Sequence, residues 1–477
     1  MPEVRVRFAP SPTGFLHIGG LRTALYDFLF ARKHNGKFIL RIEDTDRNRL
    51  VEGAVENLIS SLERLGLHID EGPSVGGDFG PYIQSERLDL YHEHARELLD
   101  KGLAYRCFCS PETLEQMRLQ QQERKEFVKY DRRCLALTPA EIEANIQAGK
   151  PSVLRLAMPQ ERKFRFFDQI RGEVEMDASQ SDDQVLLKAD GFPTYHLAAV
   201  VDDHFMKISH VIRGEEWLSS TPKHIYLYEC FGWESPVWVH LPLILNPDRS
   251  KLSKRMNDVS VESYLEKGYL KQALLNFIAL LGWHAADDRE LYSLDELCEV
   301  FSLERVSKSG AVFDLTKLNW MNAHYLRDLP LEEIAEECKR YFDALALDTS
   351  DECKYLKAVE IARQRVNLLP EIAEYCQMFY QINPLCPEDE QIIQGVEGQA
   401  VINWFLQEIP QRFPLDTEKI TVMVNSAIAD LNIKGKKFYT PLRLALLGQA
   451  HGPDLPSSFD VLGVEEVIIR LKQAQRS

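Results

Sequence analysis

The stretch that decides the fold is residues 4–20, Val4-Arg5-Val6-Arg7-Phe8-Ala9-Pro10-Ser11-Pro12-Thr13-Gly14-Phe15-Leu16-His17-Ile18-Gly19-Gly20. Apolar and basic residues alternate over residues 4–9, which predicts a strand, and the prolines and glycine that follow predict a tight turn. Apolar residues then recur at helical spacing over residues 21–33, and residues 37–42 predict a second strand. A strand, a helix and a strand in this order predict a right-handed parallel βαβ unit.

Polar segments follow both predicted strands. The first is the turn at residues 10–20, and the second is the cluster Glu43-Asp44-Thr45-Asp46, which precedes a helix predicted over residues 51–65. In open parallel sheets, ligands bind at the carboxyl ends of the strands. We therefore expect the ligand site where these two segments meet.

Two short elements far apart in the chain carry residue types that suit a nucleotide. His17 precedes the first helix, helix N-termini attract phosphate, and the paired glycines Gly19 and Gly20 let a flat base or sugar approach the backbone. Lys251-Leu252-Ser253-Lys254-Arg255 follows an apolar strand predicted over residues 237–245. Taken alone, such a histidine is more often a structural hydrogen-bonding group, and such a basic loop most often faces solvent.

The composition is that of a globular protein with several domains. The chain has 477 residues, and a domain usually takes roughly 100–200, so three or four domains are expected. No stretch approaches the ~20 apolar residues of a membrane span, and the N-terminus lacks the layout of a signal peptide, so we expect a cytoplasmic protein. The net charge of −17 argues against a protein that coats nucleic acid non-specifically. This charge is compatible with a protein that binds a single folded RNA through a few basic segments.

Taken together, the two short elements resemble the paired signatures of class I aminoacyl-tRNA synthetases. Gly20 stands where the class pattern has a histidine, and glycine at this place is usual in the glutamyl branch. Further segments are similar to the glutamyl-tRNA synthetase family, from the first strand to beyond the catalytic region: 7–14, 41–46, 80–87, 193–196, 201–204, 212–217, 308–314 and 318–322. The resemblance covers nearly the whole chain.

The resemblance implies that ATP drives the ligation of L-glutamate to the 3′ end of tRNA(Glu). The reaction passes through glutamyl-adenylate and releases AMP and pyrophosphate. The glutamate carboxylate is itself the nucleophile, so catalysis consists of positioning the reactants and stabilising charge on the phosphates. Mg²⁺ is expected with ATP, held by phosphates and water.

The same resemblance implies the site residues. The catalytic residues are His17, Lys251 and Lys254, and the ATP-binding residues are Pro10, His17, Gly19, Gly20, Glu216 and Lys254. Glutamate is placed at Arg7, Ala9, Ser11, Glu43, Tyr195 and Arg213. Arginine suits a carboxylate because its guanidinium binds in a bidentate manner, so Arg213 and Arg7 are assigned to carboxylates and Glu43 to the α-ammonium. The competing interpretation is ordinary ion pairing among these residues.

Three of the nine cysteines form a pattern of their own. The other six, which share no common spacing, are expected to be reduced thiols, mostly buried: Cys230, Cys298, Cys338, Cys353, Cys376 and Cys386. Cys107, Cys109 and Cys134 match the first three ligands of a zinc element found in some family members, but Ala136 stands where a histidine is expected. Tyr130 is the alternative fourth ligand, as in related shorter enzymes that modify tRNA. Zinc prefers four N or S ligands, so the sequence leaves zinc binding open.

The resemblance also implies the organisation of the chain and its use of tRNA. The expected fold is an α/β Rossmann-type catalytic domain with an α+β insertion, followed by an all-α anticodon-binding region. The expected segments are the first half of the catalytic domain (1–90), an acceptor-end-binding insertion (91–184), the second half (185–245), a lysine-loop and stem-contact domain (246–320), and two helical anticodon-binding lobes (321–383 and 384–477). Arg365 is expected to read the third anticodon base, or else to be an exposed helix arginine.

Discrimination between tRNA(Glu) and tRNA(Gln) stays open at this stage. A monomer, and a need for tRNA during activation, are family expectations. Four other kinds of protein fit the residues less well. A glutamyl transferase that modifies a tRNA base lacks the C-terminal helical half. A glutaminyl synthetase would need other residues at Glu43 and around Arg213, and a cofactor nucleotidyltransferase needs no anticodon-binding tail. A non-catalytic paralogue would have lost His17 or Lys254.

Overall fold

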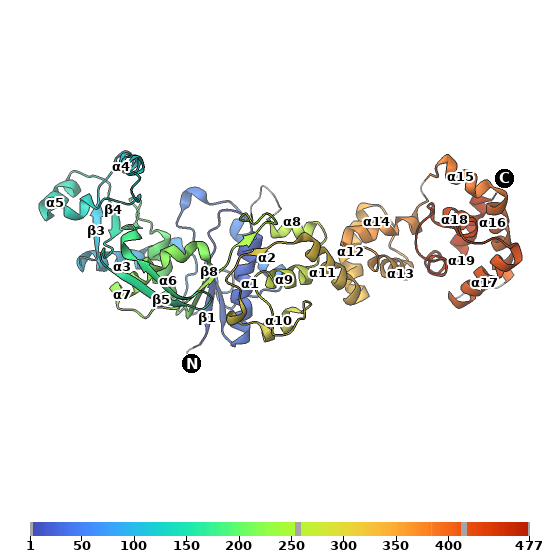
Figure 1. Cartoon of the computed structure of the whole chain (residues 1–477), viewed down its shortest axis with the longest axis horizontal. Coiled ribbons are helices and arrows are strands. Elements are labelled where there is room, and N and C mark those ends of the chain that lie inside the picture. Colours follow the sequence, from blue (N-terminus) through green and yellow to red (C-terminus); the bar gives the residue numbers. More distant parts are fainter. Residues whose placement is uncertain (1–2, 253–258, 383, 412–416, 476–477) are drawn as a thin grey trace. The chain divides into compact units, whose positions relative to one another are not determined.

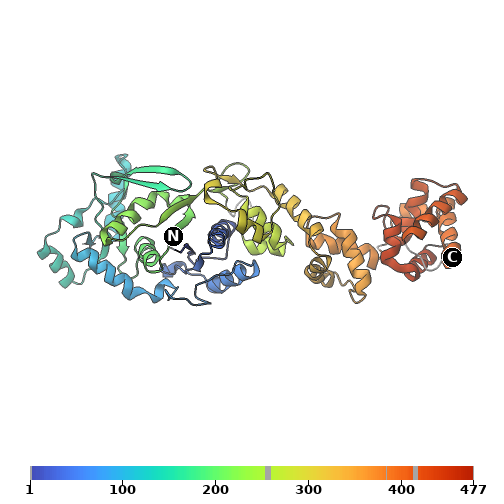
Figure 2. The same ribbon diagram turned by 90° about the horizontal axis from the view of Figure 1, so that it is seen from below.

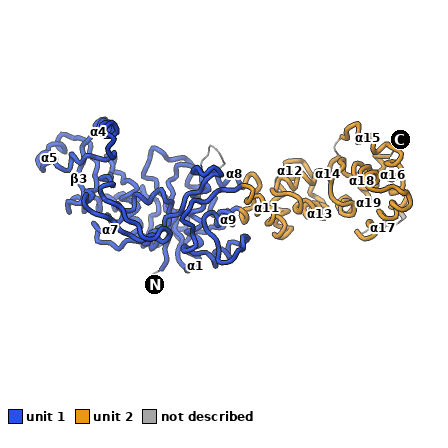
Figure 3. The backbone as a smooth tube through the Cα atoms, viewed as in Figure 1, with its two compact units in different colours: residues 1–264, 274–314 blue, residues 265–273, 315–477 orange. Residues whose placement is uncertain are grey.

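The computed structural model describes residues 3–252, 259–382, 384–411 and 417–475, and its chain forms two compact units. Unit 1 comprises Met1–Tyr264 and Leu274–Asp314, and unit 2 comprises Leu265–Ala273 and Leu315–Ser477 (Figure 1, Figure 3). None of the described helices is both long and apolar enough to cross a membrane.

The predicted βαβ unit is present at the start of unit 1. Strand β1 (Arg5–Phe8) lies parallel to β2 (Lys37–Leu40), with Arg5 opposite Lys37, and α1 (Ile18–Lys33) connects them. The helix begins three residues earlier than the apolar spacing predicts, because the side chain of His17 caps it. The next helix, α2 (Ala54–Arg64), starts later than predicted, at Ala54.

A second sheet of the expected catalytic domain lies beside β1, and it is called the catalytic sheet below. Strand β8 (His210–Gly214) is parallel to β9 (Val237–Leu241), and the backbone N–H of Ser209 donates to the Arg5 carbonyl at 2.9 Å, which places β8 beside β1. Helices α6 (Tyr195–Phe205) and α7 (Thr221–Phe231) precede and follow β8. Arg5 contacts Ser209 and Arg7 contacts Ile212, so β1 runs in the same direction as β8 and β9, and the carboxyl ends of the three strands share one edge.

Two sheets extend across the predicted boundary at residue 184. The hairpin of β5 (Lys163–Asp168) and β6 (Gly172–Asp177) joins the catalytic sheet, because Asp168 pairs with Trp238 of β9. Strand β7 (Val185–Leu187) pairs instead with β4 (Val153–Leu156), which pairs with β3 (Ala104–Cys107). Helices α4 (Pro111–Glu123) and α5 (Pro139–Gln147) lie between β3 and β4 in the chain. Neither pairing follows from local sequence pattern.

The described part of unit 2 is helical throughout (Figure 1, Figure 2). Its large helices share one apolar core that includes Phe342, Phe379, Phe405 and Phe438. They are α11 (Leu315–Asp328), α12 (Leu331–Ala344), α13 (Glu352–Arg363), α14 (Leu369–Tyr380), α15 (Pro387–Gln394), α16 (Val396–Glu408), α17 (Thr417–Leu431), α18 (Lys436–Leu447) and α19 (Leu455–Ala474). An α/β unit followed by a helical unit confirms the predicted fold class.

Candidate active site

The backbone brings together the two elements that are expected to bind ATP, the start of α1 at His17 and the loop that begins at Lys251. The N–H of Ile18 donates to the carbonyl of Val259 at 2.8 Å, and the N–H of Val261 donates to the carbonyl of Leu16 at 3.0 Å. The loop that starts at Lys251 therefore returns to the chain directly beside His17. Lys251 is exposed and lies opposite Leu245, whereas Lys254 lies outside the described residues.

His17 caps α1 and also faces outward. Its Nδ1 accepts the backbone N–H of Gly20 at 2.9 Å, so in the neutral imidazole the proton is on Nε2. The structural role that the sequence leaves open is thus present in the structure, and the side chain of His17 is exposed. A side chain at Gly19 would approach the His17 ring to 3.2 Å, which explains a glycine there.

Strand ends position the other residues predicted to bind ATP and glutamate. The Pro10 carbonyl accepts the N–H of Glu43 at 3.0 Å, so the segments after β1 and β2 lie side by side as expected. Ala9 is half-buried and Ser11 is exposed at the same edge. After β8, the carboxylate of Glu216 lies over Gly214, where any side chain would collide with it.

A buried network of six charged groups lies behind this edge. Arg7 donates to Asp203 at 3.0 and 3.4 Å, and Arg41 donates to Asp203 at 2.7 Å and to Glu43 at 3.0 Å. Arg41 also lies 3.7 Å from Asp202, which accepts hydrogen bonds from Arg87, Tyr91 and Gln84. Arg7 and Glu43 are thus paired with other residues, not with each other.

The charge state of Glu43 is set by its surroundings. Burial raises the pKa of Glu43 to about 7, against the opposing effect of Arg41 and Arg7. A carboxyl group with such a pKa is only partly ionised near neutral pH, and a cation that binds beside it increases the ionised fraction. Arg7 stays charged, because Asp203 outweighs the effect of burial and raises its pKa. Three of the five N–H groups of Arg7 donate to Asp203 or to the Ile212 carbonyl, which leaves two for a ligand.

Arg213 is surrounded differently. It is 5% exposed, and its five N–H groups donate to neutral acceptors only. These are His240 at 3.0 Å, Tyr195 at 3.0 Å, His224 at 3.0 Å, Thr221 at 3.0 Å and the Trp217 carbonyl at 3.3 Å. Among the described residues no carboxylate forms an ion pair with Arg213. Within the described part of the chain, the site therefore holds a buried cation that no protein carboxylate neutralises.

The histidines around Arg213 are held neutral. Burial, with Arg213 as a further cause, lowers the pKa of His224 far below its usual range, and burial with Lys223 and Arg213 lowers the pKa of His196 to about 3. The pKa of His240 is lowered by burial as well, although Asp168 opposes this. The three imidazoles consequently act as acceptors or donors without adding charge.

Sequence reasoning assigned no role to Asp203, Asp168, His224 or His240. Asp203 had one detectable signal, because it stands beside Asp202 directly after an apolar run, near the C-terminal end of α6, and both are buried. Such a pair requires buried cations as partners. Asp168 and His240 meet only through the β5–β9 pairing, which left no local signal.

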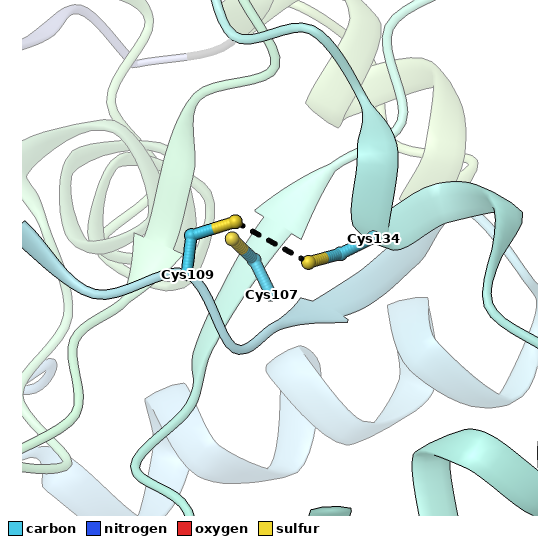
Figure 4. Close-up of side chains that lie close together, drawn as sticks. All are labelled: Cys107, Cys109 and Cys134. Atoms are coloured by element: carbon cyan, nitrogen blue, oxygen red, sulfur yellow. Dashed lines mark hydrogen bonds between the residues drawn. The ribbon is translucent and has the colours of Figure 1, made fainter. Parts of the chain in front are cut away.

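The cysteine cluster assembles as the spacing predicts. The sulfur atoms of Cys107, Cys109 and Cys134 all lie within 4.8 Å of one another, and they point toward a common centre (Figure 4). The Tyr130 hydroxyl lies 3.3 Å from the sulfur of Cys107 and 3.4 Å from that of Cys109. Ala136 is exposed at the end of the following turn. Three thiols and a phenol thus supply four donors, a set that fits a tetrahedral zinc ion.

Two arginines at the C-terminal end of α13 are held to different extents by the rest of the protein. Arg363 donates to the carbonyls of Leu326 and Leu329, at 3.3 and 2.7 Å, and pairs with Glu360. Arg365 is exposed and donates to the carbonyl of Ile361 at 2.9 Å. Arg365 is therefore the one of the two that can reach a ligand.

Comparison with known proteins agrees with this geometry. Residues 3–320 match the model of the catalytic domain of class I tRNA synthetases (E and Q), and residues 333–475 match that of an anticodon binding domain. The glutamate–tRNA ligase of Clostridioides difficile (strain 630) is 46% identical over 484 residues, 98% of either chain. That of Chloroherpeton thalassium (strain ATCC 35110 / GB-78) is 47% identical over 492 residues, covering 99% of this chain and 97% of the relative.

A solved structure is similar along the whole length. The crystal structure of a glutamate tRNA ligase from Elizabethkingia meningosepticum in complex with its amino acid superposes with a TM-score of 0.92 at 38% identity, covering 99% of each chain. The match covers 99% of the chain and therefore spans both the α/β unit and the helical unit. The chain therefore belongs to the glutamate–tRNA ligases, class I aminoacyl-tRNA synthetases that join glutamate to tRNA.

Proposed function

We propose that this ligase selects glutamate by placing its γ-carboxylate against Arg213. The observation that carries the proposal is the buried guanidinium with neutral partners only. The Arg213 guanidinium is charged, and a carboxylate adds charge attraction to its hydrogen bonds and can accept two of them at once, which a single neutral acceptor does not do. A carboxylate that replaces the Trp217 carbonyl, the most distant acceptor at 3.3 Å, therefore strengthens the site.

Tyr195 contributes a second contact to the same carboxylate. Its oxygen accepts from Arg213, so its own O–H can donate to a ligand. The ring is half-buried and packs against Trp217 at an interplanar angle of 42°, with centroids 4.3 Å apart. The side chain of glutamine carries N–H donors and no charge, so it gains less from Arg213 and Tyr195.

The amino-acid backbone is assigned to the network behind Arg213. Glu43 receives the α-ammonium, and the two spare N–H groups of Arg7 face a carboxylate, with Ala9 and Ser11 beside them. Because the pKa of unliganded Glu43 is about 7, the arriving ammonium favours its ionised form. These roles are carried over from the family and are supported by the positions of the residues at the sheet edge.

The nucleotide binds across the two elements joined at Ile18 and Val259. Enzymes of this class use ATP with Mg²⁺, and we place the ATP at Pro10, His17, Gly19, Gly20 and Glu216. Lys251 contributes from the opposite side, with Lys254 in the same loop outside the described residues. The glutamate α-carboxylate attacks the α-phosphorus, and pyrophosphate leaves. Positive and donor groups on both sides stabilise the charge that develops on the phosphates.

Recognition of tRNA is assigned to unit 2 and to the β3–β4–β7 region. Arg365 is placed at the third anticodon base, supported by its exposure and by its contrast with Arg363. An arginine here favours discrimination between tRNA(Glu) and tRNA(Gln). We further propose a cytoplasmic monomer that needs tRNA for activation.

Charging assays test the assigned function directly. Labelled glutamate is expected to be transferred to purified tRNA(Glu) in the presence of ATP and Mg²⁺, and far less to tRNA(Gln). Arg365→Ala should narrow the difference between the two tRNAs without changing the KM for glutamate, with Arg363→Ala as a stability comparison. Failure to charge either tRNA would overturn the proposal, and equal charging of both by the wild type would overturn the assignment of Arg365.

We also propose that Cys107, Cys109, Tyr130 and Cys134 hold a zinc ion that supports the fold of the insertion. Protein purified without chelator is then expected to contain zinc, as measured by atomic emission. Tyr130→Phe keeps the ring under the Arg155 guanidinium, 4.1 Å away, and removes only the donor oxygen. Outer partners alone change metal affinity about 10–100-fold, so loss of a direct ligand should cost at least about tenfold.

Two further variants serve as controls for the zinc measurement. Cys134→Ser removes a thiolate and should weaken binding more than Tyr130→Phe does, whereas Cys230→Ser changes a half-buried thiol outside the cluster and should change nothing. Metal-free wild-type protein would refute zinc binding. Unchanged zinc affinity in Tyr130→Phe would refute the phenol as the fourth ligand.

A further inference from the structure

A second layer of residues lies behind Arg213. The Nε–H of Arg213 donates to Nε2 of His240 at 3.0 Å, and Nδ1 of His240 lies 2.7 Å from a carboxylate oxygen of Asp168. Asp168 and His240 are both fully buried, and no mechanistic step described above uses them.

Chemistry fixes the direction of each hydrogen bond in this chain. A guanidinium has no acceptor, so Nε2 of His240 must accept from Arg213. The neutral ring then carries its proton on Nδ1 and donates to Asp168. The surroundings of Asp168 prevent it from turning, because its Oδ1 accepts the backbone N–H groups of Ile170 and Arg171, at 3.0 and 2.8 Å.

The topology shows how Asp168 reaches this place. It is the last residue of β5 and pairs with Trp238 of β9, two residues before His240. The backbone N–H of His240 also donates to Asp168, at 3.1 Å. The β5–β6 hairpin is therefore attached to the catalytic sheet at the point where it orients the ring of His240.

A second imidazole holds another nitrogen of Arg213. His224 accepts from Nη1 at 3.0 Å through its Nδ1, so its Nε2–H donates to His196 at 2.9 Å. The low pKa values of His224 and His240 keep both rings neutral, as acceptors for the guanidinium. Two directed acceptors from different elements thus define the plane of Arg213.

We propose that Asp168 and His240 are positioning residues for glutamate selection. Asp168 sets the tautomer of His240, and Nε2 of His240 then orients Arg213 toward the γ-carboxylate. This inference rests on the assignment of Arg213 to that carboxylate. The competing explanation is that the pair only fills the core between β5 and β9.

Two substitutions at His240 separate these explanations, because each keeps one half of the imidazole. His240→Asn retains a donor near Nδ1 for Asp168 and removes the acceptor for Arg213, whereas His240→Gln retains an acceptor near Nε2. The KM for glutamate is expected to rise at least about tenfold in His240→Asn and to stay within about threefold of wild type in His240→Gln. The KM for ATP should be unchanged in both, and direct calorimetry should show the same order for glutamate binding.

Asp168→Asn provides an independent variant of nearly identical shape. If the new amide donates to Nδ1, the proton of His240 moves to Nε2. The Nε2–H and the Arg213 N–H are then two donors that face each other, and the hydrogen bond between them is lost. We expect a rise in the KM for glutamate similar to that in His240→Asn, with thermal unfolding confirming a folded protein. Equal KM values in the two His240 variants, or a wild-type value in Asp168→Asn, would overturn the inference. If Arg213→Ala itself leaves the KM for glutamate unchanged, the assigned role of Arg213 fails first.

Discussion

Replacing Arg213 by alanine is expected to abolish glutamate activation while the chain stays folded. Removing a charged partner from a buried ligand typically costs roughly 2–5 kcal/mol or more, about 30-fold to several thousand-fold in affinity. The fold should survive, because the five acceptors around Arg213 are neutral and its removal leaves no unpaired carboxylate. Steady-state charging kinetics and glutamate calorimetry measure the loss.

Matched variants separate charge from geometry in this experiment. Arg213→Lys keeps the charge but has three donors, not five, so it should recover only part of the affinity. Arg162→Ala removes an arginine from the surface pair with Glu229 in the same unit and should leave the KM for glutamate unchanged. Near-normal charging by Arg213→Ala would refute the assignment. An unfolded variant would contradict the prediction about the fold.

The sequence predicts the start of the fold well, because local pattern and topology agree there. Alternation over residues 4–9, the helical spacing that follows and the second strand allow one parallel arrangement, and β1, α1 and β2 confirm it. The clustering of Cys107, Cys109 and Cys134 is also predicted, since their spacing matches a known ligand pattern. In both cases the interacting residues stand close in the chain or in a characteristic motif.

The sequence does not determine which charged side chains form ion pairs with one another. Arg7 and Arg213 both read as arginines beside a strand end, yet Arg7 is paired with Asp203 and Arg213 with no carboxylate among the described residues. That difference depends on contacts between residues that are far apart in the sequence. Arg7 and Asp203 are separated by 196 positions, and Asp168 and His240 by 72. Helix α6 places Asp203, and the β5–β9 pairing places Asp168. Neither placement can be derived from a local window.

Asp203→Ala is expected to be the most destabilising single substitution in the charged network. Arg7 and Arg41 are both buried, and Asp203 is the only carboxylate among the described residues that pairs with Arg7. Breaking a buried pair by removing one partner costs about 3–5 kcal/mol, because the remaining charge is uncompensated. For a unit of this size the unfolding midpoint should fall on the order of 10 °C. Thermal unfolding followed by the tryptophans of unit 1 measures it.

The pH dependence of the same variant gives an independent check. Burial raises the pKa of Asp203, but Arg7 and Arg41 outweigh this and lower the pKa below its usual value of 3.8. The stability contributed by the ionised carboxylate is therefore present above pH 3.8 and is lost as the pH falls through the lower folded-state pKa. Wild type and variant should differ most near neutral pH and converge in acid. Glu229→Ala, in an exposed pair, should cost no more than about 1 kcal/mol. Equal midpoints for Asp203→Ala and Glu229→Ala would show that Arg7 and Arg41 do not need Asp203.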